Sequence, residues 1–305
     1  MKLTPESRVY IAGAGGMLGD AVIDHFAPRC RVKATDIDLR DPRVELADVR
    51  DAAAIARSIE DFRPDLVINL AAITDLEECE REAENAWLTN ALGAENTGLV
   101  ARRLDVPYVY VSTAGIFDGK KEVYTDFDEP NPLGVYAKSK LAGEVWVKTS
   151  VPRHFVVRAG WMMGGGPNKD KKFVGKIFRQ IEAGARELHV VDDKLGTPTY
   201  TVDFTRGIER LVESELYGLY NQVCHGAGSR YDVALELMRL WGLESSVPVV
   251  RVDSSHFSEE YFAPRPRSEK LVNVKLRARG LDIMRDWREC LREYAAQFES
   301  RLRPR

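Results

Sequence analysis

The first two-thirds of the chain alternates short apolar runs with longer segments in which apolar residues recur at helical spacing. The apolar runs are rich in β-branched residues and do not alternate with polar ones, which is typical of strands buried on both faces. The runs predict strands at Arg8–Ala12, Arg31–Thr35, Asp65–Leu70, Val106–Ser112, His154–Arg158, Leu188–Val191 and Leu219–Val223. The spacing predicts helices near Leu18–Phe26, Asp51–Asp61, Glu80–Arg103, Val135–Thr149 and Phe173–Ala183. Strands and helices in this order predict a parallel sheet with crossover helices.

After about residue 224 the pattern changes to two amphipathic helices, Ser229–Trp241 and Met284–Arg301, on either side of the proline-containing stretch 262–266. We therefore predict an α/β protein, a Rossmann-type doubly wound parallel sheet with a smaller, mostly helical C-terminal lobe. The expected division assigns the sheet to residues 1–165, with segments around 188–224 completing it. The smaller lobe takes residues 166–187 and 225–305.

Composition limits the classes of function. The 305 residues are 44% hydrophobic and 30% charged, which excludes a disordered or coiled-coil chain. A net charge of -3 gives no support for a nucleic-acid surface, and no apolar run approaches the roughly 20 residues of a membrane span. The four cysteines lack CxxC spacing, so no metal site is expected. We expect a cytoplasmic protein with no nucleic-acid and no membrane partner, and leave a homo-oligomer open.

A glycine-rich turn with the pattern GxxGxxG joins the first predicted strand to the first helix. Glycine reaches the angles of a tight turn cheaply and lets a pyrophosphate approach backbone N–H groups at a helix N-terminus. An acid, Asp36, ends the second strand, so strand, turn, helix and acid together predict a dinucleotide site. The residues of the turn expected at the cofactor are Gly13, Gly16, Met17, Leu18 and Gly19.

Asp36 also bears on the choice of cofactor. A carboxylate at this point accepts hydrogen bonds from the ribose hydroxyls of NADH and repels the 2′-phosphate of NADPH. Arg40, four residues later, has the charge to bind that phosphate or to lie in solvent. The sequence thus predicts NADH or NADPH as cofactor, with NADH favoured.

Three residues predict acid–base chemistry. Tyr136 and Lys140 are four residues apart, so in a helix they share one face. Bringing a tyrosine pKa from about 10 toward 7 needs about 4 kcal/mol, which the charges of Lys140 and of the nicotinamide are expected to supply. A hydroxyl at the end of the preceding strand, for which we choose Thr113, is the expected third partner; satisfying the strand's backbone is the alternative for it.

Together these motifs resemble an extended short-chain dehydrogenase/reductase, specifically the dTDP-4-dehydrorhamnose reductase family. The resemblance covers nearly the whole chain. Beyond the glycine turn it rests on residues 69–74, 111–113 with 117–119, 131–136, 139–144, 157–161, 193–199, 265–266 and 275–276.

The resemblance implies NAD(P)H-dependent reduction of the 4-keto group of a nucleotide-linked 6-deoxysugar. It implies that Thr113, Tyr136 and Lys140 form the catalytic set, the latter two also lying at the cofactor. Asp48 and Val49 would lie near the adenine, and Ala71 and Ala72 near the cofactor backbone. On the substrate side it implies Trp161 near the sugar and Arg265 at the diphosphate, a task suited to guanidinium geometry.

The sequence departs from the family on the side expected to bind substrate. Ala114 and Gly115 stand where the family has Asp-Tyr, and Ser268-Glu269 where it has Asn-Ser. Lys172 and Lys194 replace an Asn and a Gln; each has the charge to bind a phosphate or to be solvated. These departures predict a different sugar or nucleotide.

Two other functions remain open. A nucleotide-sugar epimerase or dehydratase of the same superfamily needs a further acid or base near the sugar, and Ala114 and Gly115 cannot serve. A non-catalytic regulatory subunit, resembling that of methionine adenosyltransferase, would bind the cofactor without turnover. Retention of Thr113, Tyr136 and Lys140 favours an enzyme.

Overall fold

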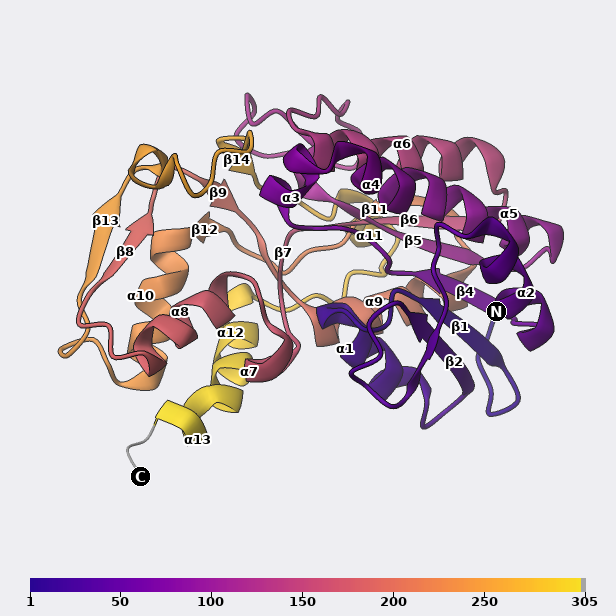
Figure 1. Cartoon of the computed structure of the whole chain (residues 1–305), viewed down its shortest axis with the longest axis horizontal. Helices are drawn as coiled ribbons and strands as arrows, with labels where there is room; N and C mark the ends of the chain where they lie inside the picture. The colour runs from indigo at the N-terminus through magenta and orange to yellow at the C-terminus, as the bar shows by residue number, and fades with distance from the viewer. Residues whose placement is uncertain (303–305) are drawn as a thin grey trace.

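Seven parallel strands form the central sheet of the computed structural model, which describes residues 1–302 (Figure 1). In chain order the strands are β1 (Arg8–Ala12), β2 (Arg31–Asp36), β3 (Val44–Leu46), β4 (Leu66–Asn69), β5 (Tyr108–Thr113), β6 (His154–Ala159) and β11 (Gly218–Asn221). Their spatial order is β11-β6-β5-β4-β1-β2-β3, and every pair is parallel. The order reverses between β1 and β4, and ligands bind at the carboxyl ends of strands at such a point.

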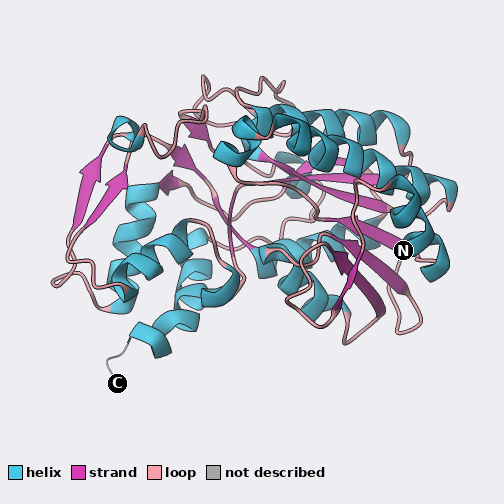
Figure 2. Ribbon diagram, in the orientation of Figure 1, coloured by secondary structure: helices cyan, strands magenta, loops and turns pink. Residues whose placement is uncertain are grey.

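Helices cover both faces of the sheet (Figure 2). On β1, Val9 and Ile11 pack into one apolar cluster while Tyr10 and Ala12 pack into another, because successive side chains of a strand point to opposite faces. The first cluster includes residues of α1 and α9, and the second includes residues of α2, α5 and α6. Their bounds are α1 (Met17–Phe26), α2 (Ala52–Phe62), α5 (Gly93–Arg103), α6 (Val135–Ser150) and α9 (Thr201–Ser214). These elements confirm the predicted doubly wound architecture.

The single helix predicted over Glu80–Arg103 is a series of helical segments. They are α3 (Leu76–Arg81), α4 (Ala83–Trp87), the π-helical turn η1 (Leu88–Leu92) and α5. The wide π turn carries Asn90, whose amide donates to Ile73 O at 3.1 Å and to Ser139 Oγ at 3.0 Å. Asn90 thereby fixes the loop after β4 against α6, and π turns are frequent at functional sites.

Most of the remaining elements build a second lobe beside the sheet (Figure 1). The main helices of this lobe are α8 (Phe173–Glu182), α10 (Arg230–Trp241) and α12 (Trp287–Ala295). Its strands are β7 (Trp161–Met163) with β10 (Pro198–Tyr200), β12 (Gly228–Ser229) with β9 (Leu195–Gly196) and β14 (Ser268–Glu269), and β13 (Val249–Val252) with β8 (Leu188–Val191). Its shorter helical turns are α7 (Gly166–Lys169), η3 (Ser254–Phe257), η4 (Ala296–Phe298) and α13 (Glu299–Leu302), whereas η2 (Ala114–Ile116) and α11 (Val274–Ala278) pack against the sheet lobe.

One predicted strand lies in a different sheet from the one expected. Leu188–Val191 was expected to complete the central sheet, but β8 pairs with β13 in the second lobe. In β8, Leu188 and Val190 are buried whereas His189 is exposed, so the strand buries one face only. A strand inside a doubly wound sheet is covered on both faces. The seventh place is taken instead by β3, a three-residue strand that the apolar pattern does not reveal.

Across residues 1–302, none of the helices combines the length and apolar character that crossing a membrane demands.

Candidate functional site

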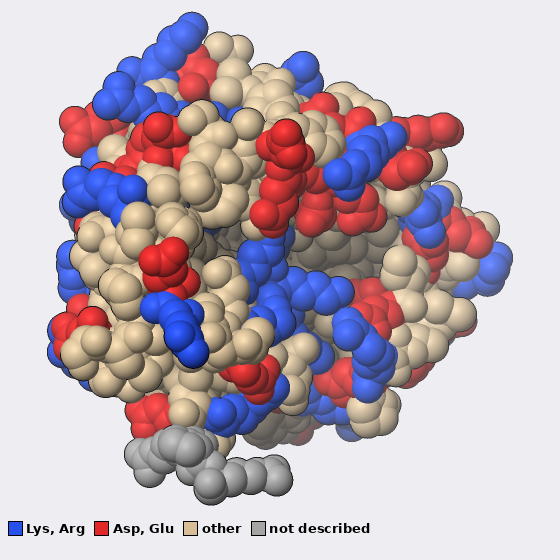
Figure 3. All heavy atoms as spheres, turned by 60° about the vertical axis from the view of Figure 1, so that its left-hand side comes forward, with Lys and Arg blue, Asp and Glu red and all other residues tan. Residues whose placement is uncertain are grey.

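A cavity of about 1580 Å³ lies between the carboxyl ends of the central strands and the second lobe. The space-filling view shows the hollow, with Lys and Arg atoms gathered along one wall and Asp and Glu atoms on the opposite wall (Figure 3). Among the residues of 1–302 that line it are all the predicted site residues except Gly19. The structure therefore brings the cofactor and substrate candidates of the sequence to one place.

The glycine turn has the geometry predicted for an anion site. Gly13 has a φ of +79°, and a Cβ there would lie 2.2 Å from the Ala71 nitrogen, so no side chain fits. A Cβ at Gly19 would lie 1.8 Å from the Ala14 carbonyl oxygen, which explains why this glycine holds α1 against the turn without lining the cavity. Gly16 begins α1 without a side-chain cap, which leaves backbone N–H groups of the first turn open toward the cavity.

Asp36 ends β2 beside this turn and lines the cavity. Its carboxylate accepts the backbone N–H groups of Gly15 and Asp38, each at 2.9 Å. Arg40 is bound to Asp38, with Nε 2.9 Å from each carboxylate oxygen, and its side chain is exposed. Asp36 thus faces the glycine turn, while Asp38 holds the Arg40 guanidinium.

Four further cofactor candidates lie at the same edge of the sheet. Asp48 binds Arg50, whose hydrogen bonds lower the Asp48 pKa, and Val49 is buried behind it. The Ala71 backbone N–H donates to Asn69 Oδ1 at 2.9 Å, which shapes the loop after β4, and Ala72 follows in that loop. All four residues line the cavity.

Tyr136 and Lys140 lie on the cavity face of α6, one turn apart, and Thr113 ends β5 opposite them. Burial raises the pKa of Tyr136 to about 12, and a hydrogen bond with Thr113 opposes the rise. Burial lowers the pKa of Lys140 to about 7, and its ammonium lies 4.1 Å from the centroid of the Tyr110 ring. Within the protein, burial is the largest influence on both groups, and it acts against their charged forms; the expected lowering of the tyrosine pKa by Lys140 and the nicotinamide stays a prediction.

A buried ion pair anchors α6 from behind. Glu144 accepts two hydrogen bonds from Arg158 of β6, at 3.0 and 2.5 Å, and a third from the Ser112 hydroxyl at 2.7 Å. Both charged side chains are at most 2% exposed. The three residues tie α6 to β5 and β6, which fixes the rotation of the helix that presents Tyr136.

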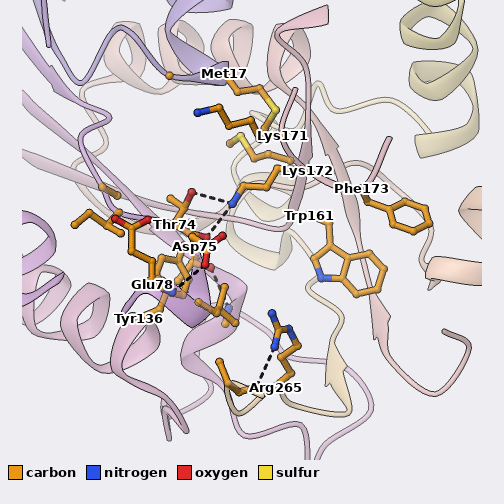
Figure 4. A pocket seen from close by; sticks show the side chains of 18 of the residues that line it. Met17, Thr74, Asp75, Glu78, Tyr136, Trp161, Lys171, Lys172, Phe173 and Arg265 are labelled. Carbon is orange, nitrogen blue, oxygen red and sulfur yellow. Dashed lines mark hydrogen bonds between the residues drawn. The ribbon is translucent and has the colours of Figure 1, made fainter. Parts of the chain in front are cut away.

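On the substrate side, Trp161 begins β7 and lines the cavity (Figure 4). Its indole N–H donates to Glu269 Oε2 at 2.6 Å, and the guanidinium carbon of Arg230 lies 3.6 Å from its ring centroid. Neither Arg230 nor Glu269 was among the predicted site residues. Arg230 carries no sequence signal beyond its helix, whereas Glu269 was visible as a departure from the family pattern.

The three predicted substrate cations each have a protein partner, and Figure 4 shows that of Lys172. Arg265 binds both oxygens of Glu77, at 2.7 and 2.9 Å, and its own carbonyl accepts Lys194 Nζ at 3.2 Å. Lys172 Nζ donates to the carbonyl and the hydroxyl of Thr74, both at 2.8 Å, so it is not simply solvated. Burial lowers its pKa. These contacts join the second lobe to the loop and helix after β4.

Known proteins of similar sequence and structure share one family. The sequence family described as RmlD substrate binding domain matches residues 7–300. The spore coat polysaccharide biosynthesis protein SpsK of Bacillus subtilis (strain 168) is 32% identical over 299 residues, which cover 96% of this chain and 99% of SpsK. A dTDP-4-dehydrorhamnose reductase of Clostridium acetobutylicum is 34% identical, with a TM-score of 0.84 and coverage of 95% of this chain and 98% of that one. A dTDP-4-dehydrorhamnose reductase of Bacillus anthracis str. Ames, solved in complex with NADP, is 28% identical, with a TM-score of 0.87 and coverage of 96% and 99%.

Proposed function

Because the chain belongs to the RmlD substrate binding domain family, we propose that it uses NAD(P)H to reduce the 4-keto group of a nucleoside-diphosphate-linked 6-deoxysugar, with dTDP as the first candidate nucleotide. The observation that carries the proposal is the meeting of Thr113, Tyr136 and Lys140 with the glycine turn in one cavity. The reductases of similar sequence and structure support the same reaction. The family assignment and the cavity together favour an oxidoreductase.

In this reaction Thr113 and Tyr136 hold the substrate's carbonyl oxygen by their hydroxyl groups. The bound dihydronicotinamide supplies the hydride to the carbon. Tyr136 then gives its hydroxyl proton to the oxygen, which completes the alcohol. A pKa of about 12 keeps the phenol protonated at neutral pH, and an alkoxide is a stronger base than a phenolate, so the raised pKa suits reduction.

The cofactor lies across the carboxyl edge of the sheet in this proposal. The N-terminus of α1 would hold its pyrophosphate, and Asp36 would accept hydrogen bonds from the adenosine ribose, which favours NADH. The proposed cofactor contacts are those of Gly13, Gly16, Met17, Leu18, Gly19, Asp36, Asp48, Val49, Ala71, Ala72, Tyr136 and Lys140. Gly19 contributes by packing α1 onto the turn rather than by contact with the cavity.

The substrate lies against the second lobe. Trp161 is proposed at the sugar, and Arg265, Lys172 and Lys194 at the phosphates. This assigns residues 1–160 with β11 to the cofactor, and residues 166–187 with 225–302 to the substrate; β7 and β8 join the latter. The four free, buried cysteines suit a reducing compartment, and we propose the cytoplasm.

The structure removes the main argument against an epimerase or dehydratase but gives no direct support for either. The sequence argument against it was that Ala114 and Gly115 offer no acid or base. Glu269 now supplies a carboxyl beside Gly115. A reductase consumes one reduced cofactor for each product, whereas an epimerase returns it to its starting state, so cofactor consumption separates the two.

The test is the loss of absorbance of NADH and NADPH with a panel of 4-keto-6-deoxy sugars carried on different nucleoside diphosphates. We expect turnover with at least one sugar, and a fall in kcat of about 1000-fold in Tyr136→Phe with cofactor binding retained. Tyr231→Phe, which removes a hydroxyl outside the cavity, is the matched control and should keep full activity. Cofactor binding without turnover on the whole panel would favour the regulatory alternative instead.

A further inference from the structure

Glu269 brings a carboxyl group to the reacting end of the cavity from a distant part of the chain. It lies in β14, where it pairs with Gly196 of β9. A Cβ at Gly196 would lie 2.2 Å from the Trp161 ring, so the indole packs directly on that strand. The indole N–H donates to Glu269 Oε2 at 2.6 Å, and this bond fixes the orientation of the carboxyl group.

The other oxygen, Oε1, occupies space opened by a missing side chain. A Cβ at Gly115 would lie 3.2 Å from Oε1, 3.4 Å from Thr113 Oγ1 and 3.7 Å from Tyr136 Cε1. The carboxyl oxygen, the threonine hydroxyl and the tyrosine ring therefore surround the space where a side chain at position 115 would begin. A larger residue at 115, such as the tyrosine usual in the family, would displace Glu269. Gly115 and Glu269 are thus complementary departures from the family pattern.

Oε1 has no hydrogen-bond donor among residues 1–302, and the partly buried Glu269 lines the cavity, so this oxygen is open to the cavity. A ligand that fills the cavity displaces water from this oxygen, so leaving the oxygen unpaired in the complex is unfavourable and a hydrogen-bond donor on the ligand is favoured. Burial raises the pKa of Glu269, and the Trp161 hydrogen bond and the nearby cations oppose the rise.

The charges around Glu269 decide which donor fits. Arg230, Arg265 and Lys194 act on its carboxyl group, so its surroundings are already positive. An ammonium group, as on an amino sugar, would meet repulsion from three cations. A neutral hydroxyl meets none, and hydrogen bonds to a carboxylate are stronger than those between neutral groups.

We propose that Glu269 is a specificity-determining residue: its Oε1 accepts a hydrogen bond from the sugar hydroxyl on the ring carbon next to the keto carbon. The inference rests on the proposed reductase function, because Thr113 and Tyr136 are taken to hold the keto oxygen. It assigns to Glu269 and Gly115 jointly the selection of a sugar that carries this hydroxyl. A 4-keto sugar lacking it leaves Oε1 unpaired and is rejected.

The experiment compares two substrates, a dTDP-4-keto-6-deoxy hexose and its 3-deoxy analogue, in the full-length protein. Wild type should prefer the hydroxylated sugar by about 100-fold in kcat/KM. Glu269→Ala should lose activity on the hydroxylated sugar alone, so that its preference for this sugar in kcat/KM falls from about 100-fold to a few-fold. Glu269→Gln keeps an amide oxygen as acceptor and should retain an intermediate preference. An unchanged preference in Glu269→Ala, with a loss on both substrates, would overturn the proposal.

Gly115→Ala supplies a second route that leaves every functional group in place. Its methyl group presses on Oε1 and should weaken the preference in the same direction, even where Glu269→Ala does not fold. Melting temperature and NADH affinity of each variant report whether the fold is intact. If wild type reduces neither sugar, the proposed function fails. Glu269 can then be tested by itself: calorimetry with NAD⁺ bound measures the ratio of the binding affinities for the two sugars. If this ratio is the same in Glu269→Ala as in wild type, the inference is overturned.

Discussion

The two walls of the cavity are built in different ways. The wall assigned to the cofactor consists of a turn and strand ends whose backbone sets the shape, as at Gly13 and Gly16. The wall assigned to the substrate consists of side chains from short segments far apart in the chain, such as Trp161, Arg230 and Glu269. A backbone-built wall changes only if the fold changes, whereas a side-chain wall can change by single substitutions. This difference explains why the departures from the family pattern gather on one wall.

The largest expected effect tests the backbone wall. Gly13→Ala places a methyl group 2.2 Å from the Ala71 nitrogen and should abolish cofactor binding, with a loss of stability about 3 kcal/mol beyond that of its control. The control is Gly184→Ala, which has a similar positive φ of +86° but nothing within 4 Å of the new methyl group. It should cost about 1 kcal/mol, the conformational penalty alone. Chemical denaturation and NADH titration measure both, and equal effects would show that strain rather than contact matters at Gly13.

The next effect tests the side-chain wall. Arg265→Ala removes charge-assisted hydrogen bonds worth about 1.5–3 kcal/mol and should raise the KM for the nucleotide sugar about 10- to 100-fold, with the NADH Kd unchanged. Arg267→Ala, two residues away, exposed and outside the cavity, is the control and should behave as wild type.

Glu77→Gln separates two roles of Arg265 because Glu77 holds its guanidinium. If the arginine binds the diphosphate, weakening its protein partner leaves KM unchanged or lowers it. A rise in KM equal to that of Arg265→Ala would mean instead that the ion pair only supports the loop.

The smallest effect concerns a side chain on the cofactor wall, Asp36. Asp36→Ala should reduce the preference for NADH over NADPH about tenfold, since it removes both the ribose acceptor and the repulsion of a 2′-phosphate. Glu45→Ala, an exposed residue outside the cavity, makes the same change in net charge and serves as control. Kinetic constants with both cofactors provide the measurement. A preference unchanged by Asp36→Ala would remove this residue from the ribose.

The elements of the sheet were predictable because regular burial on both faces leaves a local signature in the sequence. Thus β1 is found with its predicted bounds, and the turn after it has the expected geometry. The three-residue β3 was missed because so short a run carries no period. For β8 the apolar run identified a strand, but pairing with β13, about sixty residues away, is decided by packing.

The site was predictable where one motif supplies the chemistry. Tyr136 and Lys140 lie on one helix, so their spacing fixes their relation. Glu269 was visible only as an unusual residue, because its place beside Gly115 depends on how β14 packs across the cavity. Burial raises the pKa of Tyr136, and the spacing of residues in a sequence does not report that contribution.

The path of the chain between the two lobes limits how they can be recombined. It leaves the sheet after β6 to form β7, returns through β10 to α9, and leaves again after β11 to form β12. The substrate lobe is therefore several pieces, and Gly160, at the first crossing, has no room for a Cβ beside the Thr197 carbonyl. A chimera that exchanged this lobe between two relatives would need matched splice points at each crossing. Exchanging individual wall residues, beginning with 115 and 269 as a pair, is the simpler route to a new sugar preference.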